Sequence, residues 1–318
     1  MGRERGAHTD TGHHPHPTLP LKGRAKANTK HPPQNRPINP TRYDYPQPST
    51  KKPKPMSDSI LVTRTGAVTE IKLNRPQVHN AFDDKLIADL TAALIDAELD
   101  ANVRCVILTG AGTSFSAGAD IGWMRSMAKA SEAENRDDAL RLAALMRTLN
   151  FLSKPTIARV NGAAYGGGVG LIACCDIAIG IDAAKFSLSE VKLGLVPAAI
   201  SPYVIAAIGL RHARRLFVSG EVFDAATAAR IGLLHESVAA DQLDASVDRA
   251  VHFLGKGGPL AQGEAKQLAL RVAGVTRESA EQIDTENARV IARLRVSSEG
   301  QRGLAAFLDK RAPDWVRE

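Results

Sequence analysis

Two stretches of small residues could bring backbone N–H groups close to a ligand. The first, residues 116–121 (SAGADI), follows the apolar run 103–109, and the second, residues 161–170 (NGAAYGGGVG), follows the apolar run 155–160. Each stretch precedes a segment that we expect to be helical, and a helix N-terminus presents unpaired N–H groups and a favourable dipole. Two such termini facing one oxygen would form an oxyanion hole. The alternative is that the glycines only permit tight turns and close packing of helix on sheet.

Strands and helices alternate along the part of the chain that must position these stretches. Residues 60–64 and 67–73 are expected to form a β-hairpin around Gly66, because β-branched residues recur at every second position. Further strands are expected at 103–109, 155–160 and 176–181, and helices at 83–100, 131–151, 225–231, 241–254, 259–272, 277–295 and 301–311. This order predicts an α/β fold with a largely parallel sheet and right-handed crossovers, followed by a helical C-terminal part.

The positive charge of the chain is concentrated in its first 55 residues. The whole chain has a net charge of +7, of which residues 1–55 contribute +8 and the remainder −1. The same segment holds 11 of the 17 prolines and 5 of the 9 histidines, and it has too few apolar residues to form a core. We therefore expect a disordered basic tail, with the alternative that translation starts at Met56. Such a tail leaves RNA binding open, although the neutral remainder argues against it.

Other classes of protein are disfavoured by the sequence. No run of 18 apolar residues is present, so a membrane-spanning helix is not expected. Three cysteines, two of them adjacent at Cys174 and Cys175, do not have the spacing of a metal site or a disulfide framework. Gly166-Gly167-Gly168 does not match a dinucleotide-binding loop, and the G-x-S-x-G motif of serine hydrolases is absent. We expect a cytoplasmic protein without a metal.

The order of the motifs resembles the crotonase (enoyl-CoA hydratase/isomerase) superfamily. The matching positions extend from about residue 60 to Trp315 and include Asn74-Arg75-Pro76, Asn80-Ala81, Thr109-Gly110, Phe115-Ser116-Ala117-Gly118-Ala119-Asp120, Lys154-Pro155, Asn161-Gly162, Gly166-Gly167-Gly168, Cys175-Asp176, Phe186, Glu190, Gly194, Pro197, Gly220, Phe307 and Lys310. The resemblance implies the ββα spiral core of the ClpP/crotonase-like fold in residues 56–254 and a helical trimerisation region in residues 255–318. It also implies an acyl-CoA thioester as substrate, no cofactor beyond the CoA of that substrate, and a homotrimer or dimer of trimers.

The resemblance also assigns roles to individual residues. By similarity, Ala119 and Gly167 donate the two N–H groups that stabilise a thioester enolate. The positions that match the family's contacts to CoA and substrate are Val78, Ala81, Ala117, Asp120, Ile121, Gly166, Pro197, Phe307 and Lys310. Asp120 has a second interpretation, as an acidic residue that favours the dipole at a helix start.

One of the two carboxylates that hydratases of this family use is missing. Glu190 matches the second catalytic glutamate, whereas the position of the first is occupied by Gly170. We interpret Gly170 as room for a bulky acyl group or an extra water molecule. With Glu190 alone, double-bond isomerisation competes with hydration, because isomerisation needs only one base. The expected activity is enoyl-CoA hydration, and the alternatives are isomerisation, RNA binding and a non-catalytic scaffold.

Residues 194–203 bear on the substrate. Their sequence, GLVPAAISPY, is similar to the bacterial methylglutaconyl-CoA hydratase-like subgroup, which is associated with leucine and terpenoid catabolism. This similarity implies a branched or carboxylated enoyl-CoA, with methylglutaconyl-CoA as the leading candidate. A carboxylated substrate would need a cation near it, and Arg125 and Lys192 are candidates that the sequence does not rank.

Overall fold

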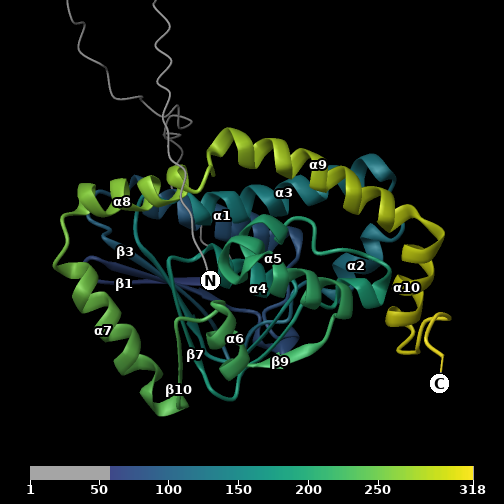
Figure 1. Ribbon diagram of the computed structural model, residues 1–318, viewed down its shortest axis with the longest axis horizontal. Coiled ribbons are helices and arrows are strands. Elements are labelled where there is room, and N and C mark those ends of the chain that lie inside the picture. The colour runs from purple at the N-terminus through teal and green to yellow at the C-terminus, as the bar shows by residue number, and fades with distance from the viewer. Residues whose placement is uncertain (1–57, 318) are drawn as a thin grey trace, which may run out of the picture. The chain divides into compact units, whose positions relative to one another are not determined.

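The computed structural model describes residues 58–317, and their strands form two sheets (Figure 1). The larger sheet has the order β1-β2-β3-β5-β7-β10 and consists of β1 (Ile60–Thr65), β2 (Val68–Leu73), β3 (Cys105–Gly110), β5 (Thr156–Val160), β7 (Ile177–Ile181) and β10 (Glu236–Val238). In this sheet β1 and β2 pair antiparallel, and the other neighbours pair parallel. The smaller sheet has the order β4-β6-β8-β9 and consists of β4 (Ser114–Ser116), β6 (Ala163–Tyr165), β8 (Lys185–Ser187) and β9 (Val222–Asp224).

Helices follow most strands and complete the α/β architecture. They are α1 (Asp84–Leu99), α2 (Ile121–Met127), α3 (Glu132–Asn150), α4 (Gly167–Cys174), α5 (Ser201–Ser219), α6 (Ala225–Ile231), α7 (Leu243–Gly255), α8 (Pro259–Val272), α9 (Arg277–Val296) and α10 (Ser298–Leu308), with short 3₁₀ helices η1 (Pro76–Val78), η2 (Ser189–Leu193) and η3 (Ala240–Gln242). Side chains fix several helix starts, as in the capping box of Ser131 and Glu134 at α3. None of the helices in residues 58–317 is long and apolar enough to cross a membrane.

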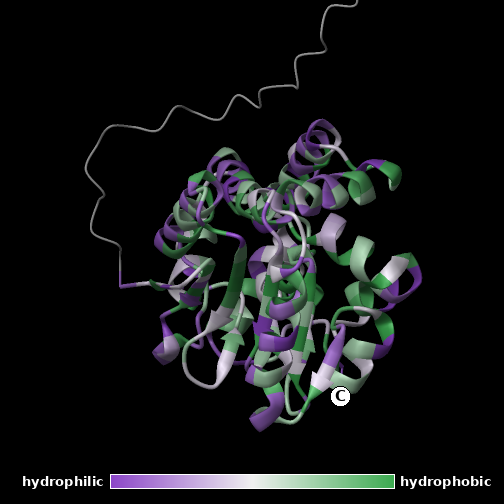
Figure 2. Ribbon diagram, turned by 90° about the vertical axis from the view of Figure 1, so that its left-hand side faces the viewer, coloured by the Kyte–Doolittle hydropathy of each residue, from purple (hydrophilic) through white to green (hydrophobic). Residues whose placement is uncertain are grey.

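The core lies where strands β3 and β5 and helix α4 are covered by further helices. All six residues of β3 are buried, as expected for a strand of a parallel sheet that is covered on both faces. Helix α9 lies along α3, and α10 turns beside α2 (Figure 1). Figure 2 shows hydrophobic strands in the interior and hydrophilic residues on the outer sides of the helices. The C-terminal helices therefore pack beside the part of the fold that contains the two small-residue stretches.

The expected α/β fold is confirmed, with differences in detail. The short strand β4 was not expected, and the helix after the second stretch begins inside that stretch, at Gly167. Strands β9 and β10 were not expected either, because three residues are too few to show alternation. Helix α5, from Ser201, was not expected. The expectations for residues 1–55 concern a part of the chain outside the described residues.

Candidate active site

The two small-residue stretches meet in the fold. A Cβ atom at Gly118, where φ is +81°, would lie 2.7 Å from the carbonyl oxygen of Tyr165 and 3.6 Å from the backbone nitrogen of Gly167. A Cβ at Gly168 would likewise lie 2.7 Å from the carbonyl oxygen of Ser116. Any side chain at these positions would push the stretches apart. The glycines thus do more than permit turns, because they let one backbone approach the other.

Two N–H groups at this meeting point have no acceptor among the described residues. The neighbours of Ala119 are engaged, since Phe82 N–H donates to the Gly118 carbonyl (2.6 Å) and Asp120 N–H donates to the Phe82 carbonyl (2.8 Å). Within residues 58–317 the N–H of Ala119 makes no such bond, and the N–H of Gly167 has no partner there because that residue opens α4. This arrangement can receive a developing negative charge on one oxygen, as an oxyanion hole does.

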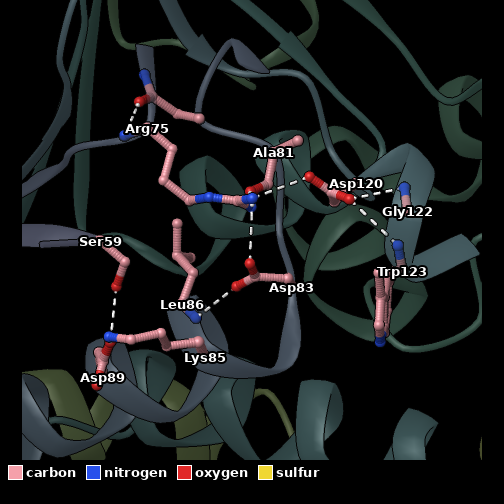
Figure 3. A network of polar contacts seen from close by, with 11 residues as sticks. Ser59, Arg75, Ala81, Asp83, Lys85, Leu86, Asp89, Asp120, Gly122 and Trp123 are labelled. Atoms are coloured by element: carbon pink, nitrogen blue, oxygen red, sulfur yellow. Dashed lines mark hydrogen bonds and ion pairs between the residues drawn. The ribbon is translucent and has the colours of Figure 1, made fainter. Parts of the chain in front are cut away.

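Asp120 holds the first stretch in place through an ion pair and a helix cap (Figure 3). Its Oδ2 accepts from Nη2 of Arg75 at 3.0 Å, and its Oδ1 accepts from the N–H groups of Gly122 and Trp123 at the start of α2. Arg75 also pairs with Asp83 at 3.1 Å. The structure thus agrees with the interpretation of Asp120 as a residue at a helix start.

A buried asparagine is hydrogen-bonded to the same stretch and to the segment before it. Asn80 has φ +57°, and its Nδ2 donates to the carbonyls of Ala111 and Ser114, both at 2.9 Å. Ser116 Oγ donates to the Asn80 carbonyl and accepts from the N–H of Gly118. The motif residues Arg75 and Asn80 therefore position the backbone next to Ala119.

Glu190 lies beside the start of α4. Its Oε1 lies 3.0 Å from the position that a Cβ atom at Gly166 would take, and φ of Gly166 is +47°. The carboxyl group is buried, and Oε2 has no hydrogen-bond partner in the described residues. Burial raises the pKa of Glu190 to about 7, against a smaller lowering by a backbone N–H. A carboxyl group with this pKa can accept and donate a proton near neutral pH.

A cavity of about 280 Å³ opens between the two stretches and the helices around them. Seven of the candidate residues line it, namely Ala117, Ala119, Gly166, Gly167, Glu190, Pro197 and Phe307. Five candidates lie outside its lining, namely Val78, Ala81, Asp120, Ile121 and Lys310. Assignment of these five residues to CoA stays a prediction. Phe82 and Trp123 also line the cavity, and Phe82 limits the space at Gly167, where a Cβ atom would lie 2.6 Å from its ring.

The interpretation of Gly170 as free space is wrong. A Cβ atom at Gly170 would lie 2.2 Å from Cγ2 of Ile200 and 3.3 Å from Cε of Met146. Ile200 is 2% exposed and lines the cavity. An isoleucine from the segment before α5 therefore fills the space next to Gly170, so neither a water molecule nor an acyl group can occupy it. Glu190 is the only acidic side chain in the lining contributed by residues 58–317.

The basic side chains of the lining are Lys192 and Arg295. Lys192 was one of the two proposed cations, whereas the other, Arg125, is exposed on α2 and does not line the cavity. Arg295 was missed because it belongs to α9, far along the chain. The only local signal is its position four residues after Ile291, another lining residue, which places both on one face of the helix.

Comparisons with known proteins agree with this geometry. The family model of enoyl-CoA hydratase/isomerase matches residues 63–318. The crystal structure of an enoyl-CoA hydratase from Shewanella pealeana is 42% identical, with a TM-score of 0.66, and covers 81% of this chain and 96% of its own. An enoyl-CoA hydratase structure from Mycobacterium avium has a TM-score of 0.73 at 34% identity, over 82% of this chain and 100% of its own. The 2,3-dehydroadipyl-CoA hydratase of Escherichia coli is 32% identical over 258 residues, or 80% of this chain and 98% of the relative. The crotonase fold is confirmed, and the chain belongs to the enoyl-CoA hydratase/isomerase family.

Proposed function

We propose that the chain adds water to the double bond of an α,β-unsaturated acyl-CoA thioester. The observation that carries this proposal is the position of Glu190, a buried carboxyl with a pKa of about 7, next to the free N–H groups of Ala119 and Gly167. These N–H groups would bind the thioester carbonyl oxygen, where negative charge develops as the nucleophile adds. Loss of one such donor typically costs ~3 kcal/mol of transition-state stabilisation.

In the proposed reaction Glu190 transfers one proton of the added water to the α carbon, and the other proton stays in the hydroxyl group. The carboxylate accepts a proton from water as the hydroxyl group bonds to the β carbon, and the thioester becomes an enolate. The same carboxyl then donates that proton to the α carbon, and the carbonyl re-forms. One group can serve both steps because its pKa of about 7 lies near the ambient pH.

The substrate and assembly rest on the sequence resemblance. We propose a branched or carboxylated acyl group, with methylglutaconyl-CoA as the leading candidate on the similarity of residues 194–203. We also propose a homotrimer or dimer of trimers built with residues 255–318, next to a catalytic core in residues 56–254. The three cysteines are free and buried, which suits a reducing compartment such as the cytoplasm.

Isomerisation of a 3-enoyl-CoA is the second candidate, and the contact between Gly170 and Ile200 favours it. Because Ile200 fills the space next to Gly170, the described lining holds a single carboxylate. Glu190 would remove a proton from the α carbon and return it to the γ carbon, which requires no activated water.

Turnover of the purified chain on crotonyl-CoA and on a 3-enoyl-CoA distinguishes these reactions. We expect crotonyl-CoA to lose its conjugated-thioester absorbance and to give 3-hydroxybutyryl-CoA, identified by mass. Glu190→Gln should lower the rate at least a hundredfold, whereas Glu264→Gln, an exposed glutamate on α8, should leave it unchanged. Formation of a conjugated product from the 3-enoyl-CoA alone would establish the isomerase. Absence of turnover on both of these substrates and on 3-methylglutaconyl-CoA would refute both proposals.

A further inference from the structure

One wall of the cavity contains a largely buried arginine that the proposed mechanism does not use. Arg295 lies near the end of α9, and its side chain is only 12% exposed. It lines the cavity together with Ile291, and its guanidinium group lies over the ring of Trp123, 5.5 Å from the centroid. The helix, the indole ring and the neighbouring α3 therefore fix the position of this cation.

Only part of the donor capacity of Arg295 is used within the described residues. Its Nη1 donates to Oδ1 of Asn135 at 3.2 Å and to Oδ2 of Asp138 at 2.8 Å. Its Nε and Nη2 make no hydrogen bond to the part of the chain that the structure describes. These two nitrogens present parallel N–H groups, the arrangement that binds both oxygens of a carboxylate.

The hydrogen-bond donors around Arg295 also favour an anion. Asp138 is completely buried and pairs with both Arg295 and Arg141, and Arg141 also pairs with the exposed Asp84, so two arginines and two aspartates balance in charge. Nε and Nη2 of Arg295 bind neither of these two carboxylates. The nearby indole Nε1 of Trp123 is a further buried donor without a partner in residues 58–317. Apart from these groups, α3, α9 and α10 contribute apolar lining, namely Ala139, Leu142, Ile291, Leu304 and Phe307. A wholly apolar acyl chain would displace water from the free donors and offer no acceptor, which is unfavourable.

We propose that Arg295 binds a carboxylate at the far end of the acyl group and makes the enzyme selective for acyl-CoA thioesters with such an end. The acyl chain extends from the oxyanion hole at Ala119 and Gly167 along the apolar walls, and its terminal carboxylate meets Nε and Nη2 of Arg295. This proposal rests on the proposed function in one respect, namely that the cavity holds the acyl group. It replaces Arg125 as the candidate cation and leaves Lys192 as the competitor to be tested.

The test compares substrates that differ only in the terminal group. Glutaconyl-CoA, its 3-methyl derivative and the homologue one methylene longer carry the carboxylate, and the enoyl-CoA thioesters that end in methyl instead are the matched controls. Binding of the saturated pair glutaryl-CoA and pentanoyl-CoA, measured by calorimetry, gives a readout that needs no turnover. We expect the wild type to prefer the carboxylated member in both assays.

The informative variant is Arg295→Gln combined with Asp138→Asn, which removes both members of the buried ion pair and leaves no buried charge unpaired. The ratio of kcat/KM for carboxylated over uncharged substrate should fall about 30-fold, as expected for the loss of a charge-assisted hydrogen bond. The matched control is Arg147→Gln combined with Asp284→Asn, which removes another largely buried pair between α3 and α9 that does not line the cavity. This control should leave the ratio unchanged.

The outcomes separate this proposal from the proposed function. If the wild type turns over both substrates without preference, or if Lys192→Gln and not the Arg295 variant removes the preference, the role of Arg295 is refuted and the hydratase stands. If neither substrate is turned over but glutaryl-CoA binds more tightly than pentanoyl-CoA in an Arg295-dependent way, the proposed function fails and this inference holds. Equal binding of the two saturated thioesters would refute it.

Discussion

Replacing Glu190 by glutamine should stabilise the folded protein above pH 7 while it removes catalysis. Burial raises the pKa of this carboxyl from its ordinary value of 4.5 to about 7, so the folded state binds the proton more tightly than the unfolded state. The contribution of Glu190 to the free energy of unfolding therefore falls as the pH rises from about 4.5 to about 7, and it is constant above that range. The two pKa values differ by an amount equivalent to about 3 kcal/mol.

Glutamine has nearly the same shape and no charge at any pH, so Glu190→Gln removes this penalty. The free energy of unfolding of the variant should be close to that of the wild type at pH 4.5 and higher by about 3 kcal/mol at pH 8. The relevant assay is urea unfolding at several values between pH 5 and pH 8, without CoA ligands and at equal protein concentration, since ligands and subunit association also stabilise the native state.

The exposed Glu264 on α8 provides the matched control, because Glu264→Gln removes a carboxylate from the surface and none from the cavity. Its difference from the wild type should be small at every pH. A difference for Glu190→Gln that is the same at pH 5 and pH 8, or a variant that is less stable than the wild type at pH 8, would refute the reasoning that burial destabilises the charged form of Glu190 in the folded protein.

Three further predictions follow from the same geometry. Gly170→Ala places a Cβ atom 2.2 Å from Ile200 Cγ2, so it should lower the free energy of unfolding by about 1–3 kcal/mol, and Ile200→Ala in the same chain should restore part of the loss in a double-mutant cycle by urea unfolding. Gly118→Ala should lower kcat about a hundredfold, measured on crotonyl-CoA, because its Cβ would lie 2.7 Å from the Tyr165 carbonyl and displace the neighbouring N–H donor. If Glu190 is the base, kcat/KM for a 3-enoyl-CoA should rise with pH and level off above about pH 7, and a rate that falls over this range would contradict that role.

The α/β order of the chain could be predicted from the sequence because strands and helices leave local periodic patterns. The hairpin of β1 and β2, the buried strand β3 and the long helix α3 lie within a few residues of their expected positions. The strands β4, β6 and β8 were not predicted, because each has only three residues and forms by pairing with strands that are distant in the sequence.

The roles of Glu190 and Asp120 were suggested by the family resemblance, and the structure adds the surroundings of each side chain. Glu190 alone resembles an ordinary surface charge in the sequence, and its burial beside Gly166 follows from the packing of η2 against α5 and α10. The contacts of Asp120 to Arg75 and to the start of α2 likewise show its role in the fold, while its assignment to CoA stays a prediction. The sequence identified both carboxyl groups as candidates, and the surroundings of each group in the fold determine what it can do.

The sequence by itself determined the fold class and the two stretches whose backbone forms the candidate oxyanion hole, because small residues and periodic patterns act over short distances along the chain. Only the tertiary structure decided which side chains fill the cavity and which charges line it. Ile200 fills the space next to Gly170, and Arg295 donates a hydrogen bond to Asn135, which lies 160 residues earlier in the sequence. No local pattern records such contacts, since they arise when helices from distant parts of the chain pack against one another.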